Sequence, residues 1–110
     1  MNYQQLTDQG RSLIKLNKLS EAKFFFEKAL ELRPDFVGAL TNLAVVEHEL
    51  GNLNHAVRLY KEAVAVSPKI ALKSENKILR VIYYFSQNNI QEALEVLNVL
   101  LDQNPKDALL

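Results

Sequence analysis

The sequence predicts an all-α fold of three helical hairpins, and three observations lead to this class. Two segments repeat without gaps at a spacing of 34 residues. Within them, apolar residues recur at the i, i+3, i+4 and i+7 positions that are typical of helices. The 110 residues include only three glycines and three prolines, too few for the many tight turns of a β-sandwich or barrel. A chain of this length is expected to form a single domain.

The repeat is defined by small, aromatic and proline residues at fixed positions. In the first copy and then in the second they are Ala22, Phe26, Ala29 and Pro34, followed by Ala56, Tyr60, Ala63 and Pro68. A third copy is recognised at Ala93 and Pro105, which lie 37 residues after Ala56 and Pro68. The longer spacing indicates three additional residues just after Pro68, within 69–73.

The first hairpin is predicted from helices near residues 3–16 and 20–32. One face of its first helix carries small or apolar residues, namely Leu6, Gly10 and Leu13. Asn17 follows this helix, and Asn is after Gly the residue that best adopts the left-handed conformation of a helix end. In the second helix Phe26 is expected in the core, so Phe24 should point outward, because successive helical side chains differ by roughly 100°.

The second hairpin is predicted from helices near 36–50 and 54–66. Its first helix repeats the small and apolar face, at Leu40, Leu43 and Ala44. Glu47 is a polar residue in the last position of that face. Asp35 is expected to cap the start of this helix. Gly51 suits a left-handed residue at its end.

The third hairpin is predicted from helices near 74–87 and 91–103, with Asn88 at the turn between them. The first of these helices has the i, i+3, i+4, i+7 pattern at Ile78, Val81, Ile82 and Phe85. Because the turns are short, each pair of helices should pack as an antiparallel hairpin.

A 34-residue helix–turn–helix unit with small residues in its first helix, Ala–aromatic–Ala in its second and a closing Pro resembles the tetratricopeptide repeat (TPR). The resemblance covers nearly the whole chain. It implies a right-handed α-solenoid of three TPR-like hairpins in one domain over residues 1–110. The implied repeats are 3–36, 37–73 with the three-residue insertion, and 74–107.

The third repeat departs from the pattern of the first two. Val81 replaces the small residue found as Gly10 and Ala44, Leu97 replaces the aromatic residue and Leu100 replaces the second Ala. Wider side chains at these positions push neighbouring helices apart, so we expect the third repeat to pack less regularly.

Composition excludes several classes of function. Thirteen basic and thirteen acidic residues give zero net charge, so the basic excess of a nucleic-acid-binding protein is absent. No stretch of about 20 apolar residues is present that would span a bilayer. There is no cysteine to form disulfides or thiolate metal sites. We therefore expect no nucleic-acid partner, no membrane span and a cytoplasmic location.

The sequence offers no catalytic residues, metal ligands or cofactor site. It contains neither a glycine-rich phosphate loop nor a serine nucleophile elbow. His48 and His55 are separated by Gly51, which ends the helix between them, so they are not expected to meet. The carboxylates, Glu47 among them, are expected on solvated helix faces or near basic side chains. The prediction is a protein that is not an enzyme.

The TPR resemblance implies a concave groove, lined by the first helix of each repeat, that binds a peptide or a partner protein. The residues expected to line it and contact the partner are Arg11, Thr41, Asn42, Val45, Leu79, Ile82 and Phe85. They run from polar at the N-terminal end to apolar at the third repeat. The expected function is therefore non-catalytic protein–protein interaction.

Some TPR domains grip the C-terminal carboxylates of chaperones with a clamp of Lys, Asn and Arg side chains. The matching positions in this chain are Thr7, Arg11, Asn42, Glu75 and Leu79. Only Asn42 agrees with the clamp, and Glu75 would repel a carboxylate. A chaperone tail is therefore not the expected ligand.

Self-association is the alternative. Leu94, Leu97 and Leu101 should leave an apolar stripe on the last helix, where a terminal repeat normally has a polar outer face. A second copy could cover this stripe in a homodimer, or the chain could be a fragment of a longer TPR array. Charge is also uneven, because residues 69–80 carry four basic residues against one acidic, and 81–110 carry one basic against four acidic.

Overall fold

The computed structural model describes residues 1–69 and 77–103 and is all-helical in that part of the chain. The helices are α1 (Tyr3–Lys15), α2 (Leu19–Leu32), α3 (Val37–Glu49), α4 (Leu53–Val66), α6 (Lys77–Ser86) and α7 (Ile90–Gln103). The five helices other than α6 begin and end within one residue of the predicted bounds, and α6 ends within one residue of its predicted end. The predicted start of α6 at residue 74 lies outside the described residues. Residues 70–76, with most of the expected insertion, and 104–110 lie outside the described residues. The predicted all-α class is confirmed.

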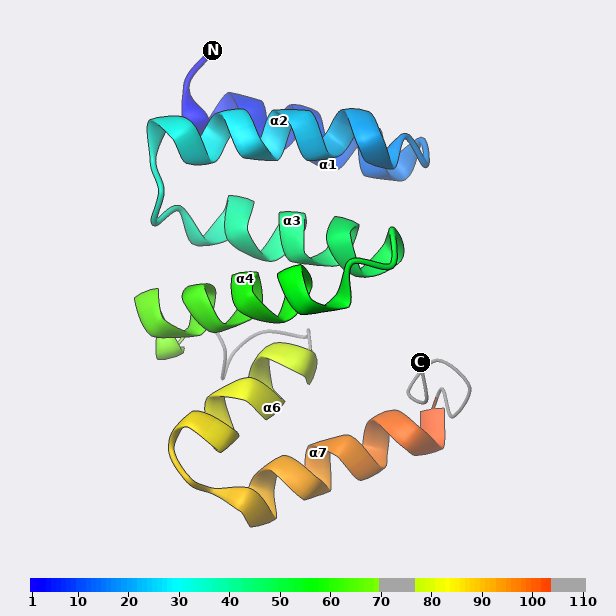
Figure 1. The fold of residues 1–110 in the computed structure, drawn as a ribbon, viewed down its shortest axis with the longest axis vertical. Helices are drawn as coiled ribbons and strands as arrows, with labels where there is room; N and C mark the ends of the chain where they lie inside the picture. The colour runs from blue at the N-terminus through cyan, green and yellow to red at the C-terminus, as the bar shows by residue number, and fades with distance from the viewer. Residues whose placement is uncertain (70–76, 104–110) are drawn as a thin grey trace.

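The helices form three antiparallel hairpins, α1–α2, α3–α4 and α6–α7, that follow one another along the long axis of the molecule (Figure 1). Each hairpin packs on the next, through α2 against α3 and through α4 against α6. The result is an elongated stack of 43 × 28 × 21 Å. This is the helical-hairpin solenoid that the repeat pattern predicts.

The core is filled by the residues that define the repeat. Phe26 and Tyr60 are buried, at 0% and 2% exposure, between layers of small side chains. Gly10 allows α1 to approach α2 closely, because a Cβ atom there would lie 2.5 Å from Cε1 of Phe26. One cluster of buried side chains extends from Leu13 in α1 to Leu79 in α6 and so joins the three hairpins.

The left-handed helix ends are confirmed. Asn17 and Asn88 have φ angles of 59° and 60°, and Gly51 has 89°. The Asp35 prediction is wrong, because the residue that caps α3 is Phe36, which makes no side-chain capping bond. Asp35 instead pairs with Arg33, whose Nε lies 3.2 Å from the Asp35 Oδ1.

Arg33 fastens the α2–α3 loop to the start of α1. Its Nη1 donates a hydrogen bond of 2.9 Å to the Tyr3 hydroxyl. Its guanidinium carbon lies 5.1 Å from the centre of the Tyr3 ring and 5.7 Å from that of Phe36, within the range of cation–π attraction. The first hairpin is thereby tied to the second at the N-terminal end of the stack.

Candidate interaction surface

The polar residues predicted to line the groove lie on α1 and α3. Arg11 is exposed, and Thr41 and Asn42 are half-buried. The Thr41 hydroxyl lies 3.1 Å from the Val37 carbonyl oxygen, and Nδ2 of Asn42 donates to the Gly38 carbonyl oxygen at 2.6 Å. The Thr41 and Asn42 side chains therefore form hydrogen bonds with backbone carbonyl groups of their own helix.

The apolar residues of the predicted groove divide into core and surface. Leu79 is 2% exposed and belongs to the main core cluster, so the structure corrects its expected place on an open groove. Val45 and Ile82 are half-buried and pack against that cluster. Phe85 is 49% exposed and is thus the most accessible apolar residue of the predicted set.

Ile82 and Phe85 line an open hollow of about 780 Å³ between α4 and α6. The α4 side of the hollow is formed by Lys61, Val64 and Ala65, with Pro68 just beyond the helix. Neither Asn42 nor Arg11 contributes to it. Of the seven predicted residues, Ile82 and Phe85 therefore line this hollow, which also includes α4 residues that the sequence analysis did not name.

A sequence signal for the α4 side was present. Lys61, Val64, Ala65 and Pro68 have i, i+3, i+4, i+7 spacing and so follow one face of the helix. Val64 is 5% exposed, whereas Ala65 and Pro68 are open to solvent. The predicted groove includes only residues from the first helix of each repeat, so this stripe on α4 is not part of it.

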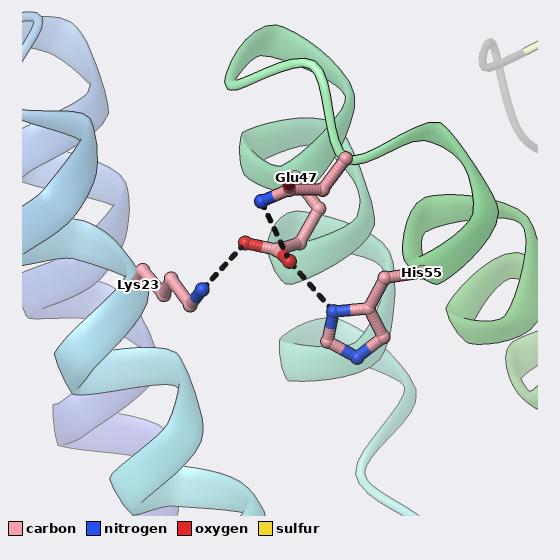
Figure 2. A network of polar contacts seen from close by, with 4 residues as sticks. Lys23, Glu47 and His55 are labelled. Atoms are coloured by element: carbon pink, nitrogen blue, oxygen red, sulfur yellow. Dashed lines mark hydrogen bonds and ion pairs between the residues drawn. The ribbon is translucent and has the colours of Figure 1, made fainter.

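A buried carboxylate connects the first two hairpins. Glu47 of α3 is only 1% exposed, so of the two expected surroundings, a solvated face or a basic neighbour, it has the second. Figure 2 shows its carboxylate between Lys23 of α2 and His55 of α4. Lys23 Nζ lies 3.1 Å from Glu47 Oε1, and His55 Nδ1 lies 2.6 Å from Oε2. Asn52 Nδ2 donates a further bond of 3.3 Å to Oε2.

These contacts keep Glu47 ionised. Burial acts to raise the pKa of Glu47, but the hydrogen bond with His55 and the charge and contact of Lys23 outweigh it and lower the pKa below the ordinary value of 4.5. A carboxylate only accepts hydrogen bonds, so the His55 contact requires a proton on Nδ1. In the sequence, the burial of Glu47 is indicated by its position at the end of an otherwise apolar helix face.

The described residues form neither a metal site nor a membrane-spanning helix. Among residues 1–69 and 77–103, no group of three or more His, Cys, Asp or Glu side chains is placed to hold a metal ion. None of the helices in this part of the chain is both long and apolar enough to cross a bilayer.

Comparison with known families agrees with the fold. Two family models, both described as tetratricopeptide repeat, match residues 4–36 and 37–67. The matched ranges contain the α1–α2 and α3–α4 hairpins and together exceed half of the chain. Repeats of this kind generally act as protein–protein interaction modules and are typically non-catalytic. On the helical stack, the repeat pattern and these matches, the chain belongs to the tetratricopeptide repeat family.

Proposed function

We propose that this chain is a non-catalytic interaction module that binds a peptide or a partner protein, with the α4–α6 hollow as the main contact surface. The single observation that supports this most is Phe85, a large apolar side chain that is 49% exposed beside an open hollow of about 780 Å³. Pockets of this size hold several side chains of a ligand.

The remaining predicted residues complete the proposal. Arg11, Thr41, Asn42 and Val45 form a more polar part of the surface on α1 and α3, whereas Leu79 acts in the core. The partner is proposed to be a protein rather than a nucleic acid because the net charge is zero.

The proposal also includes a cytoplasmic location for the protein and the repeat boundaries 3–36, 37–73 and 74–107.

Site-specific photo-crosslinking tests the proposal. A benzoylphenylalanine replaces Phe85 in one protein and Phe24, which is 54% exposed on α2, in a matched control. Both proteins are irradiated in extract from the source cells, and crosslinked partners are identified by mass spectrometry. We expect a partner at position 85 that is missing at position 24. Equal labelling at both positions would show that the hollow is not the binding surface.

Self-association through the last helix is a second candidate. Leu94 on α7 is 47% exposed, as expected for an uncovered apolar stripe. The side chains of Leu97 and Leu101, the other predicted members, lie outside the described residues. Light scattering after size-exclusion chromatography decides between the two, because a homodimer should weaken on Leu94→Glu. A strict monomer over a wide concentration range would exclude this candidate.

A further inference from the structure

We propose that the α4–α6 hollow selects a partner segment in which an apolar side chain is flanked by carboxylates. This inference rests on the proposed function and deepens it by assigning the chemical class of the partner. It follows from two features of the surface: an apolar floor, and basic side chains on and beside it that form no ion pair within the described residues.

The floor is apolar on both sides. Val64, Ala65 and Pro68 form it on the α4 side, and Ile82 and Phe85 form it on α6. Val64 and Ile82 are continuous with the core, since Val64 belongs to the main cluster and Ile82 packs against it. An entering apolar side chain would therefore rest on side chains that are packed into the core and would cover Phe85.

The edge is basic. Lys61 lines the hollow itself. Arg58 lies one turn earlier on the same face of α4, at i−3 from Lys61, and Lys69 directly follows Pro68. All three are exposed, and none forms an ion pair with another residue in the described ranges.

Acidic residues within the same segment do not cancel this charge. Between positions 58 and 69 the single acidic residue is Glu62, so three basic side chains against one give this segment a net charge of +2. Complementary charge favours both the rate and the orientation of association, and juxtaposed like charges disfavour the wrong partner. A segment with carboxylates around an apolar side chain can pack on the apolar floor and pair with the basic side chains beside it. A basic segment can pack on the floor, but its charges are repelled by those side chains.

The test uses two fluorescent peptides and the intact chain. Both peptides carry leucines at i, i+3 and i+4 spacing; glutamates fill the other positions of one peptide and lysines those of the other. Fluorescence anisotropy measures their affinities. We expect the acidic peptide to bind at least about tenfold more tightly, and the difference to shrink as salt is added.

Variants then locate the site. Lys61→Glu should weaken the acidic peptide about tenfold or more, whereas Lys18→Glu, an equal charge reversal at the exposed start of α2, should not. Phe85→Ala should weaken both peptides, and Phe24→Ala neither. Circular dichroism checks that all four variants fold, which is expected because each replaced side chain is exposed.

Three results would overturn the inference. They are equal or tighter binding of the basic peptide, no effect of Lys61→Glu, and a concentration-dependent dimer that Lys61→Glu dissociates. The last would identify the occupant as a second copy, whose α7 carries Glu92, Leu94 and Glu95. A protein crosslinked at position 85 whose capture is insensitive to Lys61→Glu would leave the proposed function intact and reject only the acidic class.

Discussion

Glu47 shows how one charged residue can hold two repeats together. Its carboxylate is 2% exposed, but Lys23 and His55 are 33% and 46% exposed, so the partners remain in contact with water. A buried ion pair gives little net stability once desolvation is counted, whereas removing one member leaves the other groups unpaired. Because Lys23 and His55 can turn toward solvent, removing the charge of Glu47 should lower the stability of the fold only moderately.

Glu47→Gln should lower the free energy of unfolding by about 1–2 kcal/mol near neutral pH. The amide keeps the size of the side chain but loses the charge that Lys23 and His55 contact. Urea denaturation followed by circular dichroism measures the change. Glu62→Gln, at an exposed position of α4, is the matched control and should change stability little.

The stabilisation by Glu47 should depend on pH in one direction. Because the folded pKa lies below the ordinary value of 4.5, the folded protein binds this proton less tightly than the unfolded chain. Stability from Glu47 is therefore full above that value and is lost as pH falls from 4.5 through the folded pKa. The difference between wild type and Glu47→Gln should shrink over that interval. A difference independent of pH would contradict the ion-pair account.

At the scale of the helices, the close approach of α1 to α2 depends on one missing side chain. Gly10 faces the Phe26 ring, and all three nearest ring atoms would lie within 2.9 Å of an added Cβ. The helix boundaries, by contrast, are local: Asn17, Gly51 and Asn88 end helices through their own backbone conformation.

Gly10→Ala should destabilise the fold although it favours the helix. Alanine gains about 1 kcal/mol in helix propensity, but overpacking a core costs about 1–3 kcal/mol. The backbone and the Phe26 ring must both shift, so we expect a net loss, measured as a lower urea midpoint. Adding Phe26→Leu should cost less in the Gly10→Ala background than in wild type. Additive effects would show that the two positions are not in contact.

At the scale of the whole molecule, stability is transmitted from one hairpin to the next. The main core cluster takes several buried residues from each of α2, α3 and α4, but Leu79 is the buried member that α6 contributes among the described residues. In a repeat stack each unit depends mainly on its neighbours. The α6–α7 hairpin is therefore attached to the stack chiefly through Leu79 and the half-buried side chains around it.

Leu79→Ala should loosen the third hairpin selectively. Removing a buried leucine side chain costs about 2–5 kcal/mol, and the loss falls on the α4–α6 contact. Hydrogen exchange with mass spectrometry should show faster exchange in α6 and α7, with α1 and α2 protected nearly as in wild type. Uniform acceleration along the chain would mean that the stack unfolds as one unit. Exposed Phe85→Ala is the control.

Most of the architecture could be predicted because it depends on local spacing. The helical periodicity, the repeat of small and aromatic residues and the turn residues place the described helix ends to within one residue, apart from the start of α6, whose predicted position at 74 lies outside the described residues. The cap of α3 was mispredicted at Asp35, because a nearby guanidinium, that of Arg33, competes for its carboxylate. Which partner the Asp35 carboxylate takes depends on the conformation of the loop, and the spacing of residues in the sequence does not predict it.

The predicted groove residues overlap the surface proposed for binding only in part. Phe85 is exposed as a contact residue should be, but Leu79, three helical positions before Ile82, is buried. Which face of α6 turns inward depends on how the third hairpin packs against α4, and neither helix specifies that alone. The α4 stripe around Lys61 was missed for the same reason.

The sequence by itself therefore determined the hairpins, their order and the small and aromatic core residues of the first two repeats, since helix formation and the spacing of small and large side chains are properties of neighbouring residues. Tertiary structure alone decided that Glu47 is buried between Lys23 and His55, and that the apolar hollow lies between α4 and α6. Both arise where side chains from different helices meet. Their energies depend on distance and on exclusion of water, which only the packed molecule defines.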